Sequence, residues 1–117
     1  MTTDLLTGRT FAVRAVAGAV ALAEPTAELS FADGRVSGRA TVNRVTGSYE
    51  LDEATLVCGP LMTTLMAGPP EAMEQERALL DVLAARPTVR AADDGSVELV
   101  TDAGVTALHE VEEVQAL

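Results

Sequence analysis

Residues 35–51, Arg35-Val-Ser-Gly-Arg-Ala-Thr-Val-Asn-Arg-Val-Thr-Gly-Ser-Tyr-Glu-Leu51, decide the fold of this chain. They form two short extended runs, separated by a polar crossing at Asn43-Arg44 and bounded by glycines. Just upstream, residues 28–32 place Leu29 and Phe31 on one face, which is typical of a half-buried strand. Asp33-Gly34 then supplies the positive φ angles that a tight hairpin needs, so we expect Val36 to begin the return strand.

The same period-two alternation recurs along most of the chain. Residues 9–16 alternate, with Phe11, Val13 and Ala15 on one face. Residues 17–23 have side chains too small for the pattern to distinguish a loop from a weak strand. Further strands are predicted at 47–51, 54–58, 88–92, 96–101 and 105–111, and residues 61–66 read as a strand or an extended segment.

One helix is predicted, from about Glu71 to Arg86. Pro69 and Pro70 precede it, where proline is tolerated, and Pro87 ends it. Its apolar face at helical spacing comprises Met73, Leu79, Leu80 and Leu83. These elements predict an α+β, β-rich fold: an antiparallel curled sheet or partial barrel of seven or eight strands, with one helix packed against it.

The length of 117 residues indicates a single domain, 1–117, with a core at about 6–111 and a tail at 112–117. The net charge is −10, of which residues 69–117 carry −8. This balance disfavours nucleic acid and anionic membranes, since binding phosphates requires clustered basic residues. No apolar stretch is long enough to predict a membrane-spanning helix. The acidic half is either a solvated face or a surface for a basic partner.

The chain offers little for catalysis or for binding a metal or cofactor. Cys58 is its one cysteine, in a strand-like run, and is expected to be a buried structural thiol. His109 is its one histidine, and zinc sites use several nitrogen and sulfur ligands. No nucleophile elbow, phosphate loop or dinucleotide fingerprint is present. We therefore predict a protein that is not an enzyme and that uses neither metal nor cofactor.

The order of motifs resembles the META domain family, which includes the heat-inducible lipoprotein HslJ. The family pattern Ser-Gly-x-x-Gly-Cys-Asn-x-x-x-Gly-x-Tyr aligns with residues 37–49, and its Thr-x-Met-Ala-Cys aligns with residues 64–68. A Glu-x-x-Glu-like helix start follows. The resemblance covers about residues 6–108 and implies a small curled β-sheet or partial barrel with one helix. It also suggests a bacterial protein with a role in stress tolerance.

The chain departs from the family pattern at both cysteines, which are replaced by Val42 and Gly68. If the family cysteines bridge, their joint loss fits a reducing compartment. We therefore expect a cytoplasmic protein. The alternative is export, because the Ala-rich run before Glu24 resembles a signal peptide cleaved after Ala23. Such cleavage would delete the strand that begins near Leu6, the family's opening strand.

Four residues are candidates for binding a ligand or partner: Asn43, Arg44, Thr64 and Glu76. Asn43 and Arg44 could hold a polar ligand, or Asn43 could bond its own backbone in a left-handed conformation. Glu76 falls within the apolar face of the helix, where a buried carboxylate must be paired. In one interpretation, Glu76 anchors the helix to backbone amides or to an arginine of the sheet. In the other, it is a ligand-facing acid with Thr64 as its partner.

Two functions follow as hypotheses. The first is a protein-interaction module that uses a sheet edge or the acidic half and acts as a monomer or weak dimer. The alternative is a carrier of a small apolar ligand in a cleft between helix and sheet.

Overall fold

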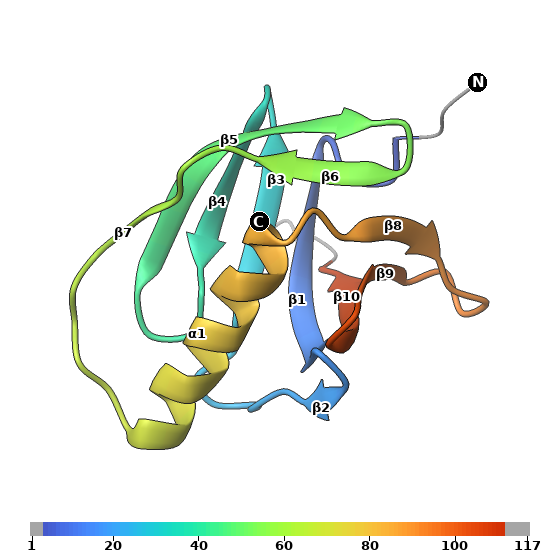
Figure 1. Cartoon of the computed structure of the whole chain (residues 1–117). Helices are drawn as coiled ribbons and strands as arrows, with labels where there is room; N and C mark the ends of the chain where they lie inside the picture. The colour runs from blue at the N-terminus through green and yellow to red at the C-terminus, as the bar shows by residue number, and fades with distance from the viewer. Residues whose placement is uncertain (1–3, 112–117) are drawn as a thin grey trace, which may run out of the picture.

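Eight antiparallel strands form a closed ring in the computed structural model of the chain, which describes residues 4–111 (Figure 1). The order around the ring is β10-β9-β8-β6-β5-β4-β3-β1, and β1 pairs with β10 to close it. The strands are β1 (Arg9–Val16), β3 (Glu28–Ala32), β4 (Arg35–Arg39), β5 (Arg44–Asp52), β6 (Thr55–Cys58), β8 (Thr88–Ala91), β9 (Val97–Thr101) and β10 (Gly104–Glu110). The β-rich α+β prediction is confirmed, and the partial barrel is a complete one.

Two further strands lie outside the ring, and each has two residues. β2 (Ala19–Val20) pairs with β1, and β7 (Met62–Thr63) pairs with β5. The uncertain run at 17–23 thus contains a short strand. The run at 61–66 is paired over only two residues, and the rest of it is extended.

Tight turns connect neighbouring strands as the sequence predicts. Asp33 and Gly34 have φ angles of 52° and 76°, and they join Ala32 to its register partner Arg35. Gly38 has a φ of 150°, and an added Cβ would lie 2.0 Å from the carbonyl oxygen of Glu28. A residue without a Cβ is therefore required for β3 and β4 to approach at this point.

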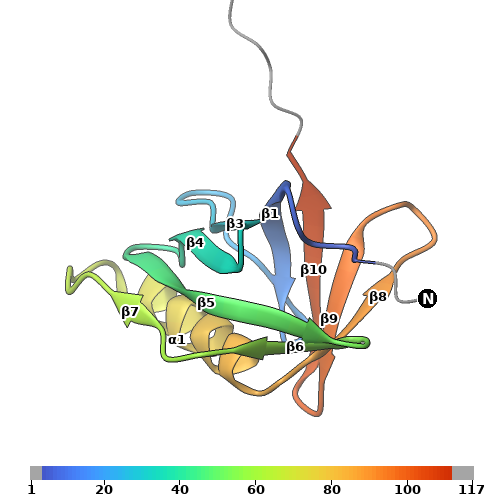
Figure 2. The same cartoon turned by 90° about the horizontal axis from the view of Figure 1, so that it is seen from above.

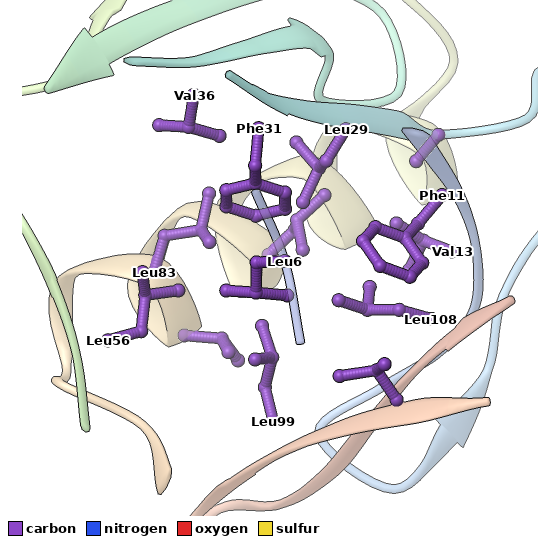
Figure 3. Close-up of a cluster of buried hydrophobic side chains, with 14 of the residues drawn as sticks. Leu6, Phe11, Val13, Leu29, Phe31, Val36, Leu56, Leu83, Leu99 and Leu108 are labelled. Atoms are coloured by element: carbon purple, nitrogen blue, oxygen red, sulfur yellow. The ribbon is translucent and has the colours of Figure 1, made fainter. Parts of the chain in front are cut away.

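Aromatic and aliphatic side chains fill the interior of the ring (Figure 3). The ring of Phe31 lies edge-on to Phe11, at 6.1 Å between centroids, and to Tyr49, at 5.2 Å. Leu29 is fully buried beside them, as the alternation predicts, and so is Leu6 from the segment before β1. Burial of this apolar surface is the main force that stabilises the fold.

The helix α1 (Pro70–Ala84) packs against β1 and β6 (Figures 1 and 2). It begins one residue earlier and ends two residues earlier than predicted. The predicted apolar face is wrong in part, since Met73 and Leu80 are only partly buried. The helix is rotated towards smaller residues, and the buried set is Ala72, Glu76, Leu79, Val82 and Leu83. Ala72 lets the helix backbone approach the sheet closely.

No helix within residues 4–111 has the length and apolar character needed to span a membrane. The predicted tail at 112–117 lies outside the described residues.

Candidate functional site

A four-residue turn between β4 and β5 faces the helix and forms the centre of the candidate site. Its ends are joined by a bond from the amide of Ala40 to the carbonyl of Asn43, at 2.8 Å. Thr41 is fully buried and has a φ of 129°, a value that L side chains adopt rarely. Its Oγ1 accepts a hydrogen bond from Nε2 of Gln75 at 3.0 Å. This conformation turns the next two amides towards the helix.

Glu76 receives those amides. Its Oε1 accepts hydrogen bonds from the backbone N–H of Val42 at 2.8 Å and of Asn43 at 2.7 Å. Its Oε2 accepts a bond from Nδ2 of Asn43 at 2.7 Å. The residue is 5% exposed. A carboxylate is tolerated at this depth because donors satisfy both oxygens, and bonds to a charged acceptor are strong. The expected anchor to backbone amides is confirmed, and no arginine takes part.

The side chain of Asn43 joins the helix to the segment that follows β7. Its Oδ1 accepts bonds from the amide of Met66 at 2.6 Å and from Oγ1 of Thr64 at 2.9 Å. Its Nδ2 donates to the carbonyl of Met66 at 3.0 Å as well as to Glu76. The amide therefore uses two donors and two acceptor sites. The expectation that Asn43 bonds its own backbone in a left-handed conformation is wrong, because the positive φ belongs to Thr41.

Thr64 and Arg44 lie at the edge of this group. Oγ1 of Thr64 accepts a bond from the amide of Arg44 at 3.0 Å, and the amide of Thr64 donates to the carbonyl of Arg44 at 3.1 Å. The alternative in which Thr64 is the direct partner of Glu76 is wrong, because the Asn43 side chain lies between them. The guanidinium of Arg44 is exposed and takes no part in the buried bonds. Asn43, Thr64, Met66 and Glu76 are called the Asn43 network below.

The sequence profile of the META domain matches residues 4–113. The chain belongs to the META domain family. The Asn43 network joins the asparagine of the first motif, the threonine of the second and Glu76 of α1. These positions lie far apart in the sequence, and the closed barrel brings them into contact.

Two solved NMR structures share the fold of this META domain. One, a protein from Burkholderia xenovorans, is 27% identical, with a TM-score of 0.72 over 93% of this chain and 86% of that one. The other is 23% identical, with a TM-score of 0.75 over 93% of this chain and 95% of that one. A search of curated proteins found no match.

The two family cysteine positions are adjacent in this META domain. A Cβ built on Gly68 would lie 2.6 Å from Cγ2 of Val42 and 3.5 Å from its Cβ. The methyl groups of Val42 occupy the space that a side chain at position 68 would need. The branched side chain of Val42 therefore fills the space that glycine leaves at position 68.

Cys58 and His109 lie away from the network. Cys58 is half-buried rather than fully buried as expected, and burial raises the pKa of its thiol to about 11. Such a thiol is mostly protonated and a poor nucleophile at neutral pH. His109 pairs in register with Ala12 on β1. Within residues 4–111, no group of three or more His, Cys, Asp or Glu residues is arranged to hold a metal ion.

Sequence reasoning missed the role of Gln75. Besides bonding Thr41, its Oε1 accepts a hydrogen bond from the amide of Leu22 at 2.7 Å, so one side chain connects the helix to two loops. Helical periodicity gave no signal for this role. Among the described residues, no buried side-chain nitrogen or oxygen lacks a hydrogen-bond partner. The hydrogen bonds of the Asn43 network are therefore satisfied within the protein.

Proposed function

We propose that this META domain is a non-enzymatic protein-interaction module whose contact surface is the segment at residues 62–66. The observation that supports this proposal most directly is the exposure of three large apolar side chains there. Met62 is 65% exposed, Leu65 is 95% exposed and Met66 is 56% exposed. Clustered apolar side chains on a surface are typical of binding sites, whereas single ones need no explanation.

The backbone of this segment is held in place from within the molecule. The Asn43 side chain bonds both the amide and the carbonyl of Met66, and Thr64 bonds the backbone of Arg44. β7 also pairs with β5 and lies at the periphery of the molecule (Figures 1 and 2). A surface already held in its bound conformation loses less entropy on association. The Asn43 network thus supports the proposal as a device that orders the contact segment.

The buried polar groups favour a structural role over a catalytic one. Each oxygen of Glu76 is occupied by donors from the protein, so this carboxylate is not available as a general base. We further propose a role in stress tolerance, from the resemblance to heat-inducible relatives, and a cytoplasmic location, from the replacement of both family cysteines by Val42 and Gly68.

Affinity capture from the native host tests this proposal. Leu65→Ser combined with Met62→Ser should abolish retention of the specific partner while leaving the melting temperature unchanged. Val20→Ser is the matched control, because Val20 is 89% exposed on β2, outside the proposed surface. If the wild type retains no protein that the double variant loses, the proposal is wrong.

A cavity between helix and sheet supports the second candidate, a carrier of small apolar ligands. It has a volume of about 540 Å³, within the usual range for ligand sites, and its walls combine apolar residues, among them Ala17, Ala78, Val82 and Val100, with the charged residues Asp81, Arg86 and Asp102. Native mass spectrometry of protein purified from its host would detect a bound apolar mass. Ala78→Phe should displace that mass if this cavity is the site.

A further inference from the structure

A row of hydroxyl side chains crosses the outer face of four neighbouring strands, β1, β3, β4 and β5. The paired residues are Thr10 with Ser30, Ser30 with Ser37, and Ser37 with Thr46. Thr46 is in turn paired with Met62 on β7, so the row ends at the proposed contact segment. Ser30 lies between the fully buried Leu29 and Phe31, which places its side chain on the opposite, outer face.

Two arginines lie opposite each other beside this row. Arg39 on β4 is in register with Arg44 on β5, and both are exposed. Like charges directly opposite each other on a sheet are destabilising. Within residues 4–111, the ion pairs are Arg9–Glu110 and Arg90–Glu98, so neither Arg39 nor Arg44 forms one, and on the other side of β4 the carboxylate of Glu28 on β3 is in register with Arg39. Arg44 faces no carboxylate in the described register of its neighbouring strands, so Glu28, Arg39 and Arg44 together keep one excess positive charge that an external anion would neutralise.

The hydroxyl row and Arg44 line a single groove. Its volume is about 610 Å³, and its walls include Glu28, Ser30, Ser37, Arg44, Thr46 and Met62. Arg35 donates a hydrogen bond to Oγ1 of Thr46 at 3.2 Å, which adds a third guanidinium at the Thr46 end of the row. Figure 1 shows β3, β4 and β5 side by side, with β7 on the outer side of β5. The charged residues of the groove wall are Glu28 and Arg44, and Arg39 and Arg35 lie on the same outer face beside it, so the face around the groove has excess positive charge on a molecule whose net charge is −10.

We propose that this groove binds an acidic, extended peptide segment of the partner protein, with a carboxylate held between Arg39 and Arg44. Guanidinium groups bind carboxylates through paired, charge-assisted hydrogen bonds, and the serine and threonine hydroxyls can donate to or accept from a peptide. Glu28 in the groove wall and the net charge of −10 oppose a densely charged polyanion such as nucleic acid and limit the segment to a few acidic residues. The inference rests on the proposed function, since it names the chemistry of the partner segment next to residues 62–66.

The test measures binding of a fluorescein-labelled eight-residue peptide of alternating glutamate and valine by fluorescence anisotropy. A peptide with glutamine in place of glutamate is the matched probe. We expect the glutamate peptide to bind more tightly, and salt to weaken that binding. Arg39→Gln and Arg44→Gln should each weaken it by about five-fold, the scale of an exposed ion pair. Arg77→Gln, at an exposed arginine of α1, should leave it unchanged.

Several outcomes would overturn the inference. Equal affinity for the two peptides, or equal losses for Arg77→Gln and Arg44→Gln, would show that no carboxylate is recognised by the arginine pair. Binding of inorganic phosphate, measured by calorimetry, without any binding of the glutamate peptide would reassign the site to small anions. The two proposals can be tested independently of each other. If peptide binding does not depend on the arginines, capture of a partner by residues 62–66 is unaffected. Conversely, Leu65→Ser should change the affinity for the peptide by no more than about two-fold.

Discussion

At the scale of single residues, Glu76 shows how a carboxylate can occupy the buried face of a helix. It accepts three hydrogen bonds from Val42 and Asn43, so the charged group exchanges water for well-oriented donors. Replacing the carboxylate by an amide puts an N–H group where only acceptors fit.

We therefore expect Glu76→Gln to lower the free energy of unfolding by about 1–3 kcal/mol, the cost of a buried unsatisfied donor. Urea denaturation at neutral pH measures this change. Glu74→Gln is the control, because Glu74 is exposed on the same helix and should change stability little. Equal stability of the two variants would show that the carboxylate does not anchor the turn.

Thr41 stands at the glycine position of the family motif and keeps a φ of 129°. Thr41→Gly should relieve this strain, although it loses the bond to Gln75. Thr41→Ala loses the same bond and keeps the strain. We expect the glycine variant to exceed the alanine variant in stability by about 1–2 kcal/mol, measured as the difference in free energy of unfolding. An alanine variant as stable as the glycine variant would argue against strain here.

At the scale of elements, the Asn43 network fastens the β4–β5 turn, the segment after β7 and α1 to one another. The adjacency of Val42 and Gly68 shows that the two family cysteine positions lie where a covalent link would reinforce this junction. The Cβ separation of 3.5 Å agrees with disulfide geometry.

A Val42→Cys, Gly68→Cys double variant should therefore oxidise to an intramolecular disulfide. Made in a Cys58→Ser background, it should gain about 3 kcal/mol of stability over its reduced form. Thiol counting and melting temperatures with and without reductant measure the result. The Val42→Cys single variant is the control and should show no response to reductant. Persistent free thiols under oxidising conditions would contradict the geometry.

At the scale of the whole molecule, the barrel is closed unevenly. β1 and β10 pair over several residues, whereas β6 and β8 share one register pair, Thr55 with Thr88. Two backbone bonds flank that pair: the amide of Leu56 to the carbonyl of Pro87, and the amide of Val89 to the carbonyl of Ala54. Among the neighbouring strands of the described ring, β6 and β8 share the fewest register pairs.

Hydrogen exchange should show this unevenness. We expect the amides of Leu56 and Val89 to exchange faster than that of Val13, whose strand is paired on both sides, since exchange follows local opening. NMR-detected exchange under native conditions gives the rates. Uniform protection of all three amides would mean that the ring opens only by global unfolding.

Local sequence determined most of the strands, the Asp33-Gly34 turn and the existence of the helix after the double proline, because periodicity and φ preferences act over a few neighbouring residues. It also marked Glu76 as unusual, since a carboxylate on an apolar face needs a partner, while the polar crossing singled out Asn43 and the family motif singled out Thr64. Only the tertiary structure decided which donors satisfy Glu76, where the ring closes, how α1 is rotated and that position 42 lies against position 68. Those features depend on packing between residues distant in the chain, which no local pattern encodes.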